Sequence, residues 1–351
     1  MLALDHRFGS ILGMKTGRYL MVWFISLLAW GWPTKGPTPK QIDPDLQLAE
    51  VQVQLAANCY QVIQDSSLYQ DKWDELMQPN FWRQAMDYPP DTIIVNIAKT
   101  RQVIEILNLQ EYRARGERRQ KAYEDSIRTA YGLKKKDEIF FTTGRNHFYR
   151  FGEMLSPIDK AIPVFIEEKT DPWYAQAILL IESPGRVQYS TEGAYGAFQL
   201  MKGVAKDMGL TVNDQVDERE DFEKAAAAAA RLLRTTCIPK ARQLCEDYKL
   251  SYKETDLWFR LLTMHIYHAG IGNVRRVIKR IKPKEGGQKL ITKMWQTKGR
   301  RFGNASQNYS QIILACFMEL DEAVRKEGII CPELNQKPSE PDTSPAPLDA
   351  I

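Results

Sequence analysis

One stretch, from Ile178 to Met201, constrains the fold and the chemistry of this chain more than any other. An apolar run ends at Glu182, and a glycine-punctuated turn, Gly193-Ala-Tyr-Gly196-Ala-Phe-Gln199, follows soon after it. A single carboxyl group therefore stands at the end of a hydrophobic segment, with a turn that carries an amide side chain back towards it. This pattern predicts a buried helix that presents one acid at its end.

The residues around this run give it helix boundaries. Asp171 is a favourable N-cap, and Pro172 is tolerated at the first helical position. Residues 173–181 are nearly all apolar, which indicates a buried helix, and Pro184-Gly185 stops it. Glu182 is then in the last turn. Burial and the negative end of the helix dipole both disfavour its anion, so we expect a raised pKa and a general acid.

Composition and charge are those of an ordinary globular protein. The 351 residues suffice for two domains with tails, and 44% of them are hydrophobic. The net charge of +4 permits contact with an anionic polymer but indicates no nucleic-acid partner. No cysteine pair has CxxC spacing, which excludes a zinc ribbon and predicts mostly free thiols; the five are Cys59, Cys237, Cys245, Cys316 and Cys331.

The N-terminal residues predict export. An apolar run, residues 19–32, follows Lys15 and Arg18 and is shorter than the ~20 residues that a spanning helix needs. Residues 1–32 therefore resemble a signal peptide, with an uncleaved anchor formed by residues 19–32 as the alternative. We expect a periplasmic protein, either free or held at the membrane.

The remaining chain divides by composition. Residues 33–45 are rich in proline and read as a linker. In residues 46–160, apolar side chains recur at three- and four-residue spacing, so a helical accessory region is expected, with a solvated helix at 113–128. Residues 161–328 are predicted to form a mainly α-helical catalytic domain, and residues 329–351 a disordered tail.

Three further helices are expected in the catalytic domain. Asp221 is a natural N-cap for a helix with six consecutive alanines, which neighbours can approach closely. An apolar helix, residues 257–266, ends at Tyr267-His268-Ala-Gly-Ile-Gly, and a last helix carries Tyr309.

Read together, these motifs resemble the catalytic domain of soluble-lytic-transglycosylase-type enzymes. The resemblance rests on Glu182-Ser183 with Ser190, on the turn ending Gln199-Leu-Met201, on Tyr267-His268-Ala-Gly-Ile-Gly-Asn and on Gln307-Asn-Tyr309. The segment from Val216 through the alanine run is similar to that of the membrane-bound lytic transglycosylase D group. The resemblance implies a lysozyme-like fold and cleavage of peptidoglycan without cofactor or metal.

The family also implies a role for each site residue. Glu182 would protonate the oxygen between N-acetylmuramic acid and N-acetylglucosamine, and would then deprotonate the C6 hydroxyl that closes a 1,6-anhydro ring. An intramolecular nucleophile of high effective concentration explains why one carboxylate suffices. The other residues would bind or orient substrate: Tyr267 by bonding Glu182, Tyr309 by lining the cleft, and also Ser183, Ser190, Gln199, Met201 and His268.

Some features depart from the family pattern and keep other functions open. The loop from Glu182 to Ser190 is one residue short, His268 replaces an asparagine and Val204 a threonine. A second carboxylate among Glu192, Asp214 and Asp217 would favour a hydrolytic muramidase, and loss of activity would leave a peptidoglycan-binding protein. His265 and His268 lack a third metal ligand at suitable spacing.

Overall fold

The computed structural model describes residues 49–55, 58–182, 190, 192–327 and 329–330. The predicted signal or anchor, the linker, Ser183 and nearly all of the predicted tail lie outside these residues. No helix among the described residues has both the length and the hydrophobicity needed to cross a membrane.

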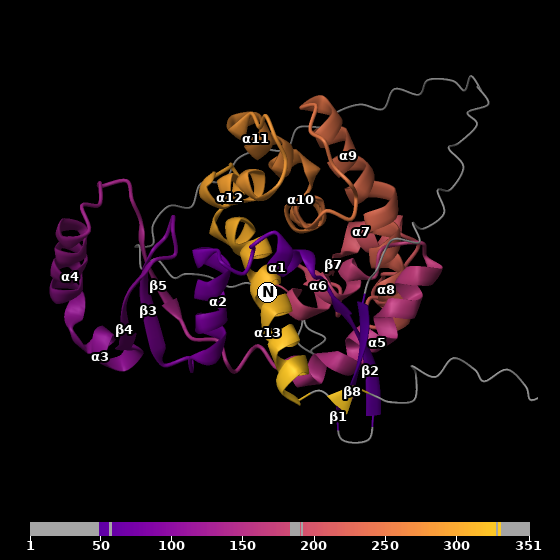
Figure 1. Ribbon diagram of the computed structural model, residues 1–351, viewed down its shortest axis with the longest axis horizontal. Coiled ribbons are helices and arrows are strands. Elements are labelled where there is room, and N and C mark those ends of the chain that lie inside the picture. The colour runs from indigo at the N-terminus through magenta and orange to yellow at the C-terminus, as the bar shows by residue number, and fades with distance from the viewer. Residues whose placement is uncertain (1–48, 56–57, 183–189, 191, 328, 331–351) are drawn as a thin grey trace, which may run out of the picture.

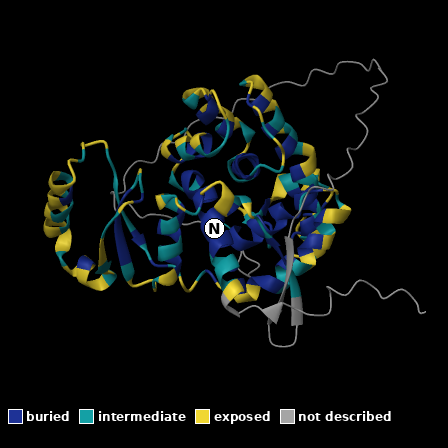
Figure 2. Cartoon of the chain, in the orientation of Figure 1, coloured by how far each residue is buried: buried dark blue, intermediate teal, exposed yellow. Residues whose placement is uncertain are grey.

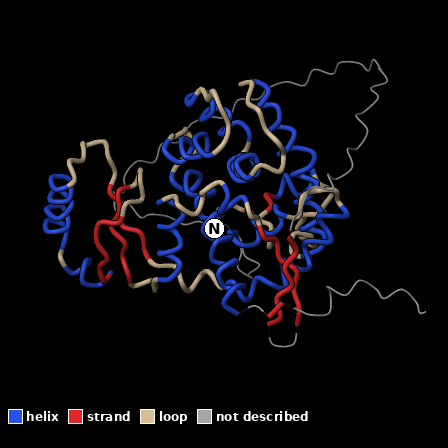
Figure 3. Tube along the Cα trace, viewed as in Figure 1, coloured by secondary structure: helices blue, strands red, loops and turns tan. Residues whose placement is uncertain are grey.

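The described chain is predominantly helical, which confirms the predicted fold class, and a small sheet lobe flanks a larger helical body (Figure 1). The strands form three small separate sheets, and Figure 3 shows them dispersed among the helices. The helices of the body are α1 (Ser67–Gln70), α2 (Met77–Asp87), α5 (Phe151–Glu167), α6 (Trp173–Glu182), α7 (Lys202–Asp207), α8 (Phe222–Leu232), α9 (Ile238–Asp247), α10 (Leu257–Ala269), α11 (Ile271–Ile281), α12 (Gln288–Gln296) and α13 (Asn304–Glu327). A π-helical turn, Leu233–Cys237, joins α8 to α9.

The sheet lobe comprises residues 92–143. Its antiparallel strands lie in the order β4-β3-β5, and its helices are α3 (Leu109–Ala114) and α4 (Gly116–Ala130). The strands are β3 (Thr92–Ile97), β4 (Val103–Asn108) and β5 (Ile139–Thr143). Most of the charged helix expected at 113–128 is α4, which begins at Gly116 after α3 ends at Ala114, and Ile127 is its one buried residue.

The expectation of a wholly helical accessory region is wrong. Strands β1 (Ala49–Leu55) and β2 (Asn58–Gln64) pair as a hairpin, and β1 also pairs with β8 (Ile329–Ile330). The physical reason is that Val51, Val53 and Leu55 alternate, while the β3 and β4 segments are rich in β-branched residues. The apparent helical spacing across residues 95–107 spans a hairpin turn instead.

The core of the body is built around α6, whose residues are all buried (Figure 2). Helix α8 packs against α5 and α6, and five of its alanines are buried, so the predicted close-packed alanine helix is confirmed. Gln176 of α6 is also buried, and its side-chain amide pairs with both backbone groups of Ile63 in β2 at 2.7 and 2.8 Å. A buried amide satisfied in this way ties the hairpin to the core.

Buried charges fix the start of α6 as well. Arg260 of α10 is 4% exposed and lies 3.1 Å from Asp65 and 2.8 Å from Asp171. The predicted capping role of Asp171 is confirmed, since its side chain accepts a hydrogen bond from the Trp173 amide at 2.9 Å. The thiols of Cys237, Cys245 and Cys316 are free and buried, as expected.

The surface of α11, α12 and the loop after them is strongly basic. Residues 271–301 carry eleven Lys and Arg side chains, all exposed, against the single acid Glu285. The apolar side chains of the two helices, among them Val277 and Trp295, turn inward. Since the whole chain has a net charge of only +4, its positive charge is concentrated on this face.

Candidate functional site

Glu182 ends α6 and is 9% exposed, as the apolar run predicts. Every residue before it in the helix is buried, so the carboxyl is held by a rigid, fully packed element rather than by a loop. Burial raises the pKa of Glu182 because desolvation disfavours the anion, and the hydrogen bond from Tyr309 opposes part of that rise. A carboxyl that retains its proton to higher pH is suited to act as a general acid.

The hydroxyl of Tyr309 donates a hydrogen bond to Oε1 of Glu182 over 2.8 Å. Tyr309 is fully buried on α13, 127 residues further along the chain. Burial, reinforced by the charge of Glu182, raises the pKa of Tyr309 well above its usual range. Tyr309 therefore remains protonated and acts as a donor that stabilises the carboxylate form of Glu182.

The hydrogen bond to Glu182 that was expected of Tyr267 is made by Tyr309 instead. Tyr267 of α10 donates to the backbone carbonyl of Phe198 at 2.7 Å, whereas Tyr309 makes the bond to Glu182 that was predicted for Tyr267. The reason is that α13 packs directly on α6 and thereby brings Tyr309 to the carboxyl. Tyr267 is still close enough for the charge of Glu182 to add to the effect of burial, which raises the Tyr267 pKa.

His268 stacks on the ring of Tyr309, with ring centroids 4.1 Å apart and an interplanar angle of 21°. Burial lowers its pKa to about 4, so the imidazole is neutral above that pH. His265, one helical turn earlier, is fully buried, and its Nε2 lies 2.8 Å from Oγ of Ser310. Burial lowers the pKa of His265 to about 3, and its contacts are structural.

The turn that follows Glu182 in the sequence is a tight hairpin of two short strands, β6 (Ala194–Tyr195) and β7 (Leu200–Met201). Gly196 has φ of 80°, and a Cβ atom there would lie 2.1 Å from the carbonyl oxygen of Arg219, so only glycine fits. Gln199 adopts φ of 47°, and its Nε2 donates to the Gly196 carbonyl at 2.8 Å. A non-glycine residue in this region is strained, and such strain concentrates at functional sites.

Arg219 fastens this hairpin to the body, a role that the sequence analysis missed. Its side chain is 3% exposed and forms a bidentate pair with Asp217 at 2.8 and 2.6 Å. It also donates to the carbonyls of Gly193 at 3.1 Å and Leu200 at 2.9 Å. The only signal in the sequence was one arginine within an acidic run. Asp217 is thus a structural partner of Arg219, which argues against its use as a second catalytic carboxylate.

The other predicted residues are less closely tied to Glu182. Oγ of Ser190 accepts a hydrogen bond from the Ala194 amide at 2.9 Å and so stabilises the turn before β6. Met201 is 44% exposed on β7, while Glu192 and Asp214 are exposed acids.

A third tyrosine near the carboxyl was also missed. Tyr149 is 6% exposed, and its hydroxyl has no hydrogen-bond partner among the described residues. Burial raises its pKa, with smaller contributions from Cys316 and Glu182. It stands just before α5, where no motif marked it. The charge of Glu182 thus contributes to the raised pKa values of three tyrosines, namely Tyr149, Tyr267 and Tyr309.

Comparison with known proteins gives one finding. Residues 167–289 match the family model described as Transglycosylase SLT domain, a range that includes Glu182, Gln199, Tyr267 and His268 but not α13. Neither the curated proteins nor the solved structures yielded a match. The match supports a lytic transglycosylase domain that acts on peptidoglycan in this part of the chain.

Proposed function

We propose that this protein is a peptidoglycan lytic transglycosylase that leaves 1,6-anhydro-N-acetylmuramic acid ends. The observation that carries the proposal is the buried Glu182 carboxyl at the end of α6, whose pKa is raised and which accepts a hydrogen bond from Tyr309 at 2.8 Å. The similarity of the segment 216–233 to the membrane-bound lytic transglycosylase D group further favours that subgroup.

In the first step, protonated Glu182 gives its proton to the glycosidic oxygen as the bond from that oxygen to C1 of N-acetylmuramic acid breaks. The Tyr309 hydroxyl stabilises the carboxylate that forms, because a hydrogen bond to a charged group is stronger than one between neutral groups. In the second step, the C6 hydroxyl attacks C1, and Glu182 takes back a proton from it. No water is consumed, and the enzyme returns to its starting protonation state.

The neighbouring residues would assist these two steps by keeping the site in its shape. His268 stacks on Tyr309 and fixes its ring, while the strained Gln199 and the exposed Met201 present side chains from the β6–β7 hairpin for contact with the sugar. Tyr267 anchors the same hairpin through Phe198.

Digestion of purified sacculi with mass spectrometry of the products tests the proposal. Anhydro products are lighter by one water than the reducing-end products of a hydrolase. Wild type should release anhydro muropeptides, Glu182→Gln should release none, and Glu192→Gln, at an exposed acid of the same segment, should retain activity. Reducing ends would establish the muramidase alternative. If wild type and Glu182→Gln both bind sacculi and release nothing, the protein is a binding module.

We also propose export to the periplasm, directed by residues 1–32. The support is the sequence pattern alone, since those residues lie outside the described part of the chain. Fractionation of bacterial cells that express either the full chain or a chain without residues 1–32 tests it. Recovery of both in the same cytoplasmic fraction would contradict export.

A further inference from the structure

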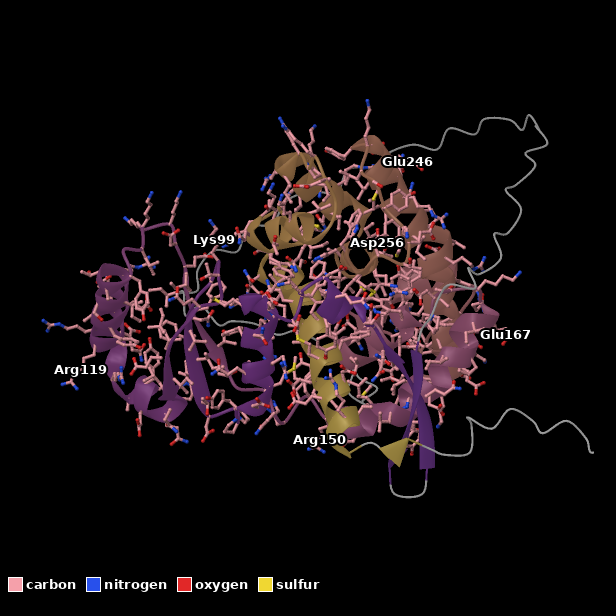
Figure 4. The ribbon with its side chains drawn as sticks, viewed as in Figure 1. Lys99, Arg119, Arg150, Glu167, Glu246 and Asp256 are labelled. Carbon is pink, nitrogen blue, oxygen red and sulfur yellow. The ribbon has the colours of Figure 1, made fainter. Side chains whose placement is uncertain are left out.

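Arg101 is the most deeply buried cation of the sheet lobe. It lies in the hairpin turn between β3 and β4 and is 1% exposed, whereas Lys99 of the same turn is exposed (Figure 4). Its backbone has φ of 62°, a left-handed conformation that is strained for a residue with a Cβ atom. Other residues with positive φ, such as Lys72 and Lys282, are exposed, so Arg101 is set apart by the burial of its charged side chain.

Contacts from two sides hold the guanidinium. Within the lobe it donates to Oδ1 of Asn96 at 3.0 Å, and across the interface it donates to Oδ1 of Asn304 at 3.2 Å and of Asn308 at 2.7 Å. Three aromatic rings surround it at 5.0 to 5.2 Å from their centroids: Phe81, Trp82 and Phe140. Both asparagines across the interface belong to the first turns of α13.

The first half of α13 is unusual because it is polar and yet buried. Gln307 donates to the carbonyl of Trp295 at 2.8 Å, and Gln311 accepts from Nε1 of Trp82 at 3.1 Å. Ser310 accepts from Nε1 of Trp295 at 2.7 Å. These hydrogen bonds and those of Arg101 are made by residues that lie before and after Tyr309 in the sequence. Together they fix the rotation of α13 about its axis.

That rotation governs the bond to Glu182. A hydroxyl roughly 8 Å from a helix axis moves by about 1.4 Å when the helix turns by about 10°. Such a motion lengthens the 2.8 Å bond to about 3.1 Å if it is perpendicular to the bond and to about 4.2 Å if it is along the bond, so even a small rotation weakens or breaks it. Asn308 precedes Tyr309 directly, so release of Arg101 acts on the residue next to the catalytic pair.

We propose that Arg101 is a positioning residue: by holding Asn304 and Asn308 it sets the rotation of α13 and keeps the Tyr309 hydroxyl on Glu182. The sheet lobe thereby forms part of the catalytic apparatus rather than an independent appendage. The inference rests on the proposed function for its kinetic consequence, but its structural content can be tested without turnover.

A double-mutant cycle on sacculus turnover tests the kinetic part. Tyr309→Phe should lower kcat by about tenfold or more, the loss of one hydrogen bond to a charged group. Arg101→Met should lower kcat by a smaller factor with KM unchanged, and should have almost no effect when Tyr309→Phe is already present. Lys99→Met, in the same turn, should match wild type. Arg101→Lys serves if Arg101→Met does not fold. Multiplicative losses would overturn the proposal, because they would show independent roles.

Fluorine NMR of the full chain with 3-fluorotyrosine at position 309 tests the structural part even if no turnover is found. The ¹⁹F resonance should move with pH as Glu182 titrates. Arg101→Met or Arg101→Lys should shift or broaden it, while Ile127→Ala, which weakens only the separate lobe core, and Lys99→Met should not. A resonance unchanged by loss of Arg101 would refute positioning, whereas an inactive wild type with the expected NMR response would refute only the proposed function.

Discussion

Replacement of Glu182 by glutamine should make the protein more stable at neutral pH, although the residue is proposed to be essential. Burial raises the pKa of this carboxyl above its ordinary value of 4.5. Between 4.5 and the raised native pKa, the folded protein holds a proton that the unfolded chain has released. The contribution of the Glu182 carboxyl to the free energy of unfolding is therefore fully present below pH 4.5 and is lost as the pH rises through the native pKa. Proton linkage sets the slope at about 1.4 kcal/mol per pH unit.

Glutamine has nearly the same shape, can still accept from Tyr309 and carries no charge. The measured quantity is the difference in the free energy of unfolding, Glu182→Gln minus wild type. This difference should be constant at pH 3.5–4, should rise with pH and should level off above the native pKa of Glu182. Urea titrations followed by tryptophan fluorescence across pH 3.5–8 measure it, and Glu192→Gln controls for loss of an exposed charge. His265 and His268 are present in both proteins, so their contributions to the pH dependence cancel in the difference. A difference that stays flat, or that falls with pH, would refute the assignment of Glu182 as a buried acid.

Other parts of the structure give three further predictions. Gly196→Ala should cost at least about 1–3 kcal/mol and abolish turnover, because its Cβ would meet the Arg219 carbonyl, whereas Gly203→Ala, with open space around it, should be neutral or slightly stabilising in thermal unfolding. His265→Gln should reduce acid sensitivity. A pKa of about 3 in the folded state means that His265 lowers the free energy of unfolding by about 1.4 kcal/mol per pH unit as pH falls from 6.5 towards 3, and unfolding measured at graded pH should show a slope smaller by this amount in the variant. Binding to sacculi should weaken with added salt if the basic residues 271–301 contact substrate carboxylates, and charge reversal at Lys279 should reduce both affinity and its salt dependence in sedimentation assays.

The sequence predicted the elements whose patterns are strong and local. A nine-residue apolar run capped by Asp171 and Pro172 has one stable interpretation, and Glu182 at its end follows from it. The alanine helix, with Asp221 as its cap, was also predicted correctly. The strands were missed because short runs such as those of β1 and β3 satisfy helical spacing when they are read together with residues beyond their turns.

The contacts between distant segments could not be predicted in the same way. Whether Tyr267 or Tyr309 bonds Glu182 depends on how α10 and α13 pack against α6, and each sequence position is compatible with both arrangements. The roles of Arg101 and Arg219 are likewise invisible locally, because Arg101 lies in a short polar turn and Arg219 in a charged run, and both settings indicate a solvated surface. Such a residue joins several segments only when it is buried, and its burial depends on the whole fold.

The distance along the chain between Glu182 and Tyr309 has a consequence for synthesis. At about 5–20 residues per second, a ribosome needs roughly 6 to 25 seconds to add the 127 residues that separate them. During that interval the nascent chain holds the acid but not its donor, and α13 is not yet in place to cover the carboxyl. The segment 167–289 that matches the family would remain in this unfinished state if expressed alone. The hydrogen bond to Glu182 therefore forms only once α13 has been made and has packed on α6, long after the acid itself.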